Sequence, residues 1–415
     1  MEDTMPPLDK GFITLTNRIN VLRSIISEKT VFKADIARKL GLSQPTVMKI
    51  IDDMEKKGLV NFAGKGVSSG GKPPTMLEFN QNARNIIGVD VNEYRIEAVR
   101  FNLGLQIIDK RIQDIRTTDT AKTITGRIVD EIKWLLAKTE TDQPIIGIGI
   151  GVPGIVDTKN GIIIYSAEMS WHNVNLLSAM RDVFDGHIVI EDSTRAIAMG
   201  ESLIGDGSNA ENFLCVNVGK GISSALVLNR KLYYGSSDSA GQLGHMLVER
   251  NGNMCDCGSY GCLETYSSGN AIEKKAKELV LGGAKTLIRD LVYGNAEKID
   301  IYMVFEAAQN EDRVALEIVE TAADYLAMAI TSVINQFDPD LIVFEGKVCR
   351  IGRLFVQLLE KQLANRKSRY LSGQARIVVL DNKRCTGSTG AAAFILDHFV
   401  NSGGVDTGFV SCIDQ

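Results

Sequence analysis

Three of the seven cysteines lie within eight consecutive residues, and this cluster constrains the fold more than any other stretch of the chain. Cys255, Cys257 and Cys262 follow His245, which is one of only four histidines. Three thiolates and a neutral imidazole form a closed tetrahedral shell for structural zinc, which leaves no position for a catalytic water. Gly258 lets the chain turn between the second and third cysteine. Reduced thiols packed in a core are the alternative explanation, because cysteine is often buried.

The overall composition is that of an ordinary globular protein. Apolar residues make up 44% and charged residues 23% of the 415 positions, which predicts two or three domains with a large core. The first ten residues are polar and contain two prolines, unlike a secretory signal. No apolar run approaches the roughly 20 residues that a membrane span requires. We therefore expect a cytoplasmic protein with no membrane partner, whose reduced thiols are available to a metal.

The net charge of -5 is unevenly distributed along the chain. Residues 11–80 contain 11 Lys or Arg and 6 Asp or Glu, a balance of +5, so the rest of the chain carries -10. A basic head on an acidic body is typical of a protein whose head meets a polyanion. A basic face that merely keeps the head in solution would give the same modest excess.

Residues 11–80 have the pattern of a helix-turn-helix. Apolar spacing predicts helices over residues 17–29 and 33–40, and Ser43 is placed to cap a third helix. The outward face of the third helix shows Gln44, Thr46 and Lys49 near its N-terminus. In a helix-turn-helix this is where side chains touch base edges in the major groove. Similar helices occur in protein-binding modules, so the helices alone do not decide for DNA.

A hairpin with a long tip follows the third helix. Strand-like segments after Gly58 and at Thr75 flank a glycine-rich loop over residues 63–74, which contains Lys65 and Lys72. Such a loop can follow a phosphate backbone or enter a minor groove closely. Together with the helices and the basic balance, this wing predicts a winged helix-turn-helix DNA-binding domain over residues 11–80.

The remaining chain shows an α/β pattern that occurs twice. A buried strand over residues 85–91 opens the first set of strands and a helix, and a similar strand near residue 212 opens a second set. We therefore expect a first α/β lobe over residues 84–210, a second lobe over 211–400 that holds the cysteine cluster, and a tail over 401–415. Two similar lobes predict a cleft between them for a small ligand.

Three motifs together resemble the ROK family of repressors, open reading frames and sugar kinases. They are the cysteine stretch, the wing segment Ser68-Ser-Gly-Gly-Lys-Pro-Pro74 and the turn Gly151-Val-Pro-Gly154. The resemblance covers essentially the whole chain. It implies an α/β fold class, with an N-terminal winged helix-turn-helix on an actin-like (ribonuclease H-like), two-lobed sugar-kinase body.

The resemblance also implies which residues form the sites. Zinc would be held by His245, Cys255, Cys257 and Cys262. The sugar pocket would include these residues: Gly154, Glu191, Asp192, Gln242, His245 and Glu264. Two positions depart from the family pattern, because Gln242 replaces a glutamate and Glu191 replaces an asparagine. Asp192 is kept where a kinase uses a base on the sugar hydroxyl. On its own, Asp192 would be read as the cap of the helix that follows.

The segments that hold ATP phosphates in the family's kinases are altered here. Asp90 is followed by Val91-Asn92-Glu93-Tyr94 in place of the family's glycines, and the second loop reads Gly219-Lys220-Gly221. A third glycine run reads Glu345-Gly346-Lys347. Phosphoryl transfer depends on backbone amides and metal ions gathered around the phosphates. The sequence therefore predicts a protein that is not an enzyme.

The prediction that results is a DNA-binding transcriptional regulator, a repressor of sugar-metabolism genes. Its partners would be double-stranded operator DNA and a sugar or sugar-phosphate effector. A homodimer or homotetramer is expected because a lone winged helix binds DNA weakly. Effector binding would change the closure of the lobes and so the spacing of two winged helices on their half-sites.

Three other functions stay open at this point. The chain could be a ROK sugar kinase with a DNA-binding head, which the segment after Asp90 argues against. It could sense zinc itself, although four ligands on one short segment favour a permanent site. It could also answer to a partner protein rather than to a sugar.

Overall fold

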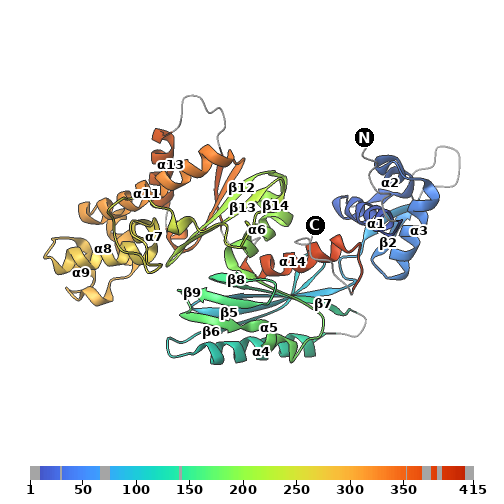
Figure 1. Cartoon of the computed structure of the whole chain (residues 1–415), viewed down its shortest axis with the longest axis horizontal. Helices are drawn as coiled ribbons and strands as arrows, with labels where there is room; N and C mark the ends of the chain where they lie inside the picture. Colours follow the sequence, from blue (N-terminus) through green and yellow to red (C-terminus); the bar gives the residue numbers. More distant parts are fainter. Residues whose placement is uncertain are drawn as a thin grey trace, which may run out of the picture. The chain divides into compact units, whose positions relative to one another are not determined.

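The computed structural model describes residues 10–28, 30–65, 75–139, 143–351, 353–366, 375–380 and 386–406 (Figure 1). The chain forms two compact units. Unit 1 consists of residues 1–150, 175–190 and 391–415, and unit 2 consists of residues 151–174 and 191–390. Residues 151–174 and 191–210, which the sequence placed in a first lobe, therefore belong to the same unit as the residues expected in the second lobe.

The head of unit 1 is the predicted winged helix-turn-helix. Its helices are α1 (Lys10–Ser27), α2 (Lys33–Leu40) and α3 (Gln44–Lys56). Its strands are β1 (Val31–Phe32), β2 (Val60–Lys65) and β3 (Thr75–Phe79), in the order β1-β3-β2. Val47, Ile50, Ile51 and Met54 of α3 are buried, as their spacing predicts. Helix α1 begins seven residues earlier than predicted. The predicted wing tip at residues 66–74, with Lys72, lies outside the described residues.

The expected C-terminal tail is in part an anchor for the head. Helix α14 (Gly387–Asn401) ends against α1, where Arg23 donates to the side-chain oxygen of Asn401 at 2.6 Å. Arg84, just after the head, donates to both carboxylate oxygens of Asp406. Gly404 is so close to the head that an added Cβ would lie 2.8 Å from Leu59. Residues up to Asp406 therefore belong to the packing of unit 1.

The first α/β sheet has the strand order β11-β7-β4-β5-β6. These strands are β4 (Asn85–Val91), β5 (Arg95–Asn102), β6 (Ile107–Asp114), β7 (Ile145–Val152) and β11 (His187–Asp192). Strands β4, β5 and β6 form an antiparallel meander, and α4 (Ala121–Ala137) packs against β5. Six of the seven residues of β4 are buried, as expected for the continuous apolar run predicted there.

The second sheet repeats this order as β14-β13-β12-β15-β16. Its strands are β12 (Phe213–Val218), β13 (Ile222–Leu228), β14 (Lys231–Leu232), β15 (Leu341–Glu345) and β16 (Arg376–Val379). In both sheets the first strand is central, the next two lie on one side and the last two on the other. The predicted duplication of the α/β pattern is thus confirmed.

Helices enclose the core of unit 2. They are α6 (Ser193–Ile204), α7 (Glu264–Ser267), α8 (Gly269–Leu281), α9 (Leu287–Leu291), α10 (Ile301–Gln309), α11 (Arg313–Phe337), α12 (Lys347–Arg350) and α13 (Arg353–Arg366). The apolar sides of α8, α10 and α11 pack with β12 and β15 in one cluster. None of the helices in the described part of the chain is long and apolar enough to cross a membrane.

A small sheet of three short strands in unit 2 was not predicted. Its strands are β8 (Ile155–Asp157), β9 (Ile162–Ser166) and β10 (Trp171–Asn175), in the order β10-β9-β8, and α5 (Leu176–Arg181) follows. Short 3-10 turns are η1 (Asp206–Asn209), η2 (Leu243–His245) and η3 (Ala296–Lys298). The turn η2 positions the histidine of the cysteine cluster.

Candidate functional site

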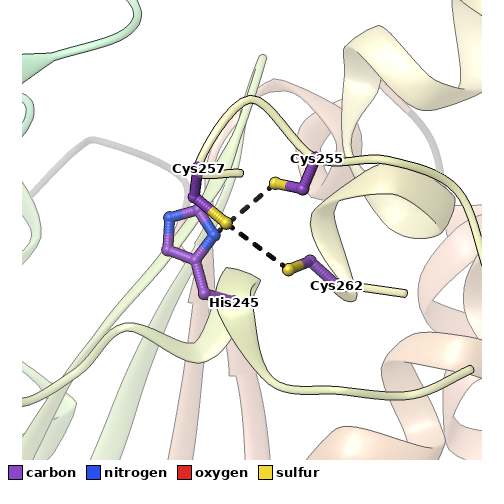
Figure 2. A group of neighbouring side chains, drawn as sticks. All are labelled: His245, Cys255, Cys257 and Cys262. Atoms are coloured by element: carbon purple, nitrogen blue, oxygen red, sulfur yellow. Dashed lines mark hydrogen bonds between the residues drawn. The ribbon is translucent and has the colours of Figure 1, made fainter. Parts of the chain in front are cut away.

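The four residues predicted to bind zinc come together in unit 2. Figure 2 shows His245, Cys255, Cys257 and Cys262 pointing toward one another, and their ligand atoms all lie within 4.8 Å of one another. Two Zn–S bonds of about 2.3 Å at a tetrahedral angle place their sulfurs about 3.8 Å apart. The Sγ atoms of Cys257 and Cys262 are 3.7 Å apart, and Cys255 Sγ lies 3.7 Å from His245 Nδ1. The donor set therefore fits a tetrahedral zinc ion.

Glycines let this loop fold back on itself. Gly258 and Gly261 have φ of 88° and 74°, in the left-handed region that favours glycine. A Cβ on Gly261 would lie 1.8 Å from the carbonyl oxygen of Glu249, whereas a Cβ on Gly258 would meet nothing within 4 Å. Leu247 pairs with Cys262 in an isolated antiparallel bridge. The loop is thus closed by backbone contacts that only glycine permits at position 261.

The three thiols of this cluster differ in their tendency to ionise: the pKa values of Cys255 and Cys262 are raised, and that of Cys257 is lowered. Burial, together with the neighbouring Cys257 and Cys255, raises the pKa of Cys262 to about 12. Burial also raises the pKa of Cys255, while Cys257, which is exposed, has a lowered pKa because hydrogen bonds from Ser259 and the two other cysteines outweigh its desolvation. A bound divalent cation would deprotonate such thiols outright.

A cavity of about 990 Å³ lies beside the cluster, and all its lining residues belong to unit 2. Five of the six residues predicted for the sugar pocket line it: Gly154, Asp192, Gln242, His245 and Glu264. Gly154 has a φ of 130°, and a Cβ there would lie 2.4 Å from the carbonyl oxygen of Tyr165. The cavity is large enough for a small ligand such as a sugar.

Asp192 serves both as a helix cap and as part of the cavity wall. Its Oδ1 accepts from the backbone amides of Thr194 and Arg195 at 3.0 Å, which caps α6. Burial raises the pKa of its carboxyl, against the effect of these amides, of the Arg195 charge and of the Gly154 amide. The two interpretations of this residue from sequence are therefore compatible.

Glu191 is not among the described residues that line the large cavity. Its side chain is 2% exposed and turns to Arg195, whose guanidinium lies 3.3 Å from Glu191 Oε1. Burial raises the pKa of Glu191 to about 7, although Arg195 acts in the opposite direction. The prediction that Glu191 lies in the sugar pocket is therefore not supported.

Sequence reasoning missed Arg195 and Tyr234, which contact Glu191, and Glu168, which lies in the cavity wall. Arg195 is buried and donates to the backbone carbonyls of Asp238 and Ala240, and its guanidinium lies 4.8 Å from the ring centre of Tyr234. Glu168 of the loop after β9 also lines the cavity. No sequence motif marks a buried arginine in the polar first turn of a helix. Glu168 was missed because the small sheet of β8, β9 and β10, whose last two strands flank it, was not predicted.

The predicted DNA-reading residues stand at the start of α3. Ser43 caps the helix, its hydroxyl accepting from the amide of Thr46 at 3.3 Å. Gln44 and Lys49 are exposed, while Thr46 is half-buried and lies against the Ser43 hydroxyl. Lys65 ends β2, but its side chain, like Lys72, is outside what the structure describes. An exposed helix start with a free polar side chain and a lysine can enter a major groove.

The comparison with family models decides the family. The model described as ROK family matches residues 86–398, and one described as MarR family matches residues 13–64. The chain belongs to the ROK family. Its head is a winged helix of the MarR type, so the architecture predicted from the sequence is confirmed.

Other ROK family members match with and without the head. The xylose repressor of Caldicellulosiruptor bescii is 27% identical over 85% of this chain and 88% of its own length. The glucokinase of Thermotoga maritima is 30% identical over 75% of this chain and 96% of its own length. A ROK family transcriptional regulator, described as a homologue of the Escherichia coli MLC protein, has a TM-score of 0.80, with 21% identity, 94% of this chain covered and 98% of that chain. The xylose repressor match thus covers more of this chain than the glucokinase match does, 85% against 75%.

Proposed function

We propose that this ROK family chain is a transcriptional repressor whose head binds operator DNA and whose cavity in unit 2 binds a sugar. Similarity to repressors along almost the whole chain supports the regulator over the enzyme. The relatives named xylose repressor make D-xylose the first sugar to test. The relatives named glucokinase and N-acetylglucosamine repressor add D-glucose and N-acetyl-D-glucosamine.

The turn after β4 is the observation that carries the choice between repressor and kinase. Here Asn92 Oδ1 accepts from the backbone amides of Tyr94 and Arg95, at 3.0 and 3.1 Å. The amide of Asn92 in turn donates to the carbonyl of Arg95. A phosphate-binding loop must offer such amides to the nucleotide. In this chain a side chain of the protein already takes them, so this turn cannot cradle a phosphate without being rebuilt.

The second phosphate segment is also closed by internal contacts. The amide of Gly219 donates to the carbonyl of Gly221, and the amide of Ile222 donates to Glu264 Oε2. A backbone amide that already donates within the protein does not stabilise an added phosphate. In this conformation the loop therefore does not offer the amides of Gly219 and Ile222 to a nucleotide phosphate.

The charges around the cavity favour an uncharged sugar over a sugar phosphate. Among the described residues, six carboxylate residues line the cavity against three lysines: Glu168, Asp192, Asp256, Glu264, Glu278 and Glu317, and Lys220, Lys274 and Lys275. A phosphate group carries close to two negative charges at neutral pH. Like charges at short range in a partly enclosed site cost free energy. We propose that hydroxyl groups of a neutral sugar meet these carboxylates as hydrogen-bond donors.

Structural zinc is part of the proposal. It would hold His245 and the neighbouring Glu264 in the cavity wall, since both belong to the segment closed by the cysteines. Operator contacts are proposed for Gln44 and Lys49 at the exposed start of α3, and also for the wing lysines Lys65 and Lys72. A homodimer or homotetramer is proposed because one winged helix alone offers too few contacts for tight, specific binding.

A thermal-shift screen tests the proposal directly. The purified protein is heated with D-xylose, D-glucose, N-acetyl-D-glucosamine, their phosphates and ATP with Mg²⁺. A ligand at a hundred times its dissociation constant stabilises the fold by about 2.7 kcal/mol. We expect one neutral sugar to raise the melting temperature and ATP to leave it unchanged. The same sugar should change the affinity for operator DNA. A shift with ATP and Mg²⁺ would restore the kinase, and no change in operator affinity would remove the repressor.

A further inference from the structure

A buried cluster behind the cavity fastens the segment that supplies Gln242 and His245 to the wall. Arg195 stands in the first turn of α6 and is 4% exposed. One guanidinium nitrogen donates to the carbonyls of Asp238 and Ala240, at 2.5 and 3.1 Å. Burying an arginine costs several kcal/mol unless it is paired and hydrogen-bonded. The N-terminus of a helix adds to this cost because it is electropositive.

Glu191 makes the burial of Arg195 possible. Its carboxylate lies against the guanidinium and accepts from the amide of Asp192 at 2.8 Å. The ring of Tyr234 stacks under the guanidinium, and its hydroxyl is hydrogen-bonded to Glu191. Three parts of unit 2 thus meet at one cation: the end of β11, the start of α6 and the segment after β14.

The fastened segment runs directly into the cavity wall. Ala240 donates to the carbonyl of Tyr234, and the carbonyl of Gly241 accepts from both the amide and the hydroxyl of Ser224 at 2.9 Å. Gly241 has a φ of 95°, and a Cβ there would lie 2.1 Å from the carbonyl of Ser224. Gln242 follows at once and lines the cavity. The position of Gln242 is therefore set by groups that do not line the cavity.

We propose that Arg195 is a positioning residue for effector binding: it holds the segment from Asp238 to Gln242 in place by donating to the carbonyls of Asp238 and Ala240, while Glu191 and Tyr234 hold its guanidinium. This inference rests on the proposed function and adds a residue to it. Loss of the Arg195 guanidinium removes the hydrogen bonds to the carbonyls of Asp238 and Ala240. The segment then loosens, and the sugar site is less well preorganised.

The test compares Arg195→Met with Tyr234→Phe, which removes only a hydroxyl, and with a matched control. Arg127→Met is the control because Arg127 of α4, in unit 1, is also paired with a carboxylate, that of Asp119, which it binds in a bidentate manner. Isothermal calorimetry with D-xylose, D-glucose and N-acetyl-D-glucosamine gives sugar affinity, and fluorescence anisotropy gives operator affinity without sugar. Hydrogen exchange of the amides of residues 240–245 reports the segment even in a protein without a sugar.

We expect Arg195→Met to weaken sugar binding at least tenfold and to speed amide exchange of residues 240–245 at least tenfold. Tyr234→Phe should do the same to a smaller extent. Operator affinity without sugar should stay within threefold, and Arg127→Met should change neither sugar affinity nor this exchange. Unchanged exchange in a folded Arg195→Met protein overturns the inference, as does an equal loss of sugar and operator affinity. If the wild-type protein binds no sugar, the proposed function fails while the exchange result still decides this inference.

A pH profile separates positioning from a merely structural role. The groups that face Glu191 are Arg195 of α6, Asp192 of its own strand and Tyr234 of the fastened segment. With the pKa of Glu191 raised to about 7, the ion pair with Arg195 forms fully only above neutral pH. Sugar affinity should therefore rise between about pH 6 and 8 in the wild type and be flat over this range in Glu191→Gln. An identical pH profile in the two proteins would contradict the inference.

Discussion

Replacing Gly261 by alanine should weaken zinc binding much more than the same replacement at Gly258. Both positions have φ in the left-handed region, which costs alanine about 1–2 kcal/mol. At Gly258 that is the whole cost, because nothing lies within 4 Å of the added Cβ. At Gly261 the Cβ would lie 1.8 Å from the Glu249 carbonyl oxygen, so the backbone must move as well. Forcing an atom into filled space adds about 1–3 kcal/mol.

These energies convert into a zinc affinity because the strain exists in the closed loop and relaxes when the metal leaves. Each 1.4 kcal/mol corresponds to about a tenfold change in the dissociation constant. Gly258→Ala should therefore weaken zinc binding by roughly 5- to 30-fold, and Gly261→Ala by roughly another 5- to 140-fold. Competition with a chromophoric chelator at pH 7.5 measures both, and circular dichroism checks that each variant is folded.

The comparison has a clear failing result. If the two variants hold zinc equally well, the close approach of residue 261 to Glu249 does not shape the metal site. If neither variant, nor the wild type, retains a metal after purification with zinc present, the cluster is a group of reduced thiols. That was the alternative left open by the sequence.

Three further changes test other parts of the molecule. Lys49→Ala should weaken operator binding and, if Lys49 contacts a phosphate, lower the slope of log affinity against log salt by about 1. Anisotropy titrations from about 50 to 200 mM salt measure this slope, and Lys56→Ala at the far end of α3 is the control. Gly404→Leu should lower the melting temperature and loosen the head in hydrogen exchange, since a Cβ at φ 75° would lie 2.8 Å from Leu59. Burial raises the pKa of Glu191 from 4.5 to about 7, so Glu191 stabilises the fold below pH 4.5 and this stabilisation is lost as the pH rises through about 7. The melting temperature of the wild type should therefore fall over this pH range, and that of Glu191→Gln should not show this fall.

Much of the fold could be predicted because local patterns coincide with the elements. The apolar run at residues 85–91 is strand β4 with the bounds predicted, and the spacing of Val47, Ile50, Ile51 and Met54 is the buried side of α3. The grouping of His245 with Cys255, Cys257 and Cys262 could also be predicted, since thiols and an imidazole on one short segment are the chemical signature of a cluster that can hold a metal, whatever the rest of the fold.

What could not be predicted depends on contacts between distant positions. Glu191 was placed in the sugar pocket by alignment, yet its rotamer is decided by Arg195 and Tyr234, which no motif marks. Residues 401–415 were expected to be a C-terminal tail. Gly403 and Gly404 instead pack closely on the head, which only the tertiary structure reveals.

Helix α14 gives the head a physical connection to the strand that ends at the pocket. His398 of α14 is hydrogen-bonded to His187, at 2.7 Å between Nδ1 and Nε2, and His187 begins β11, which ends at Asp192. The other end of this connection is the contact of Asn401 with Arg23 in the head. A ligand can bias the head only if some such element responds to both sites. This contact is therefore a place where sugar and operator binding can be coupled.

Removal of this hydrogen bond should reduce the coupling and spare each binding event. In His398→Phe, sugar affinity and operator affinity measured separately should each stay within threefold of wild type. A lost hydrogen bond is worth about 1 kcal/mol, so the factor by which sugar changes operator affinity should fall about fivefold. The operator must change sugar affinity by the same factor, which gives a second measurement of one quantity. His187→Phe should cause the same loss, and the double variant should lose no more than either alone, because both side chains make one contact. Additive losses, or coupling equal to that of the wild type, would show that the signal reaches the head by another route.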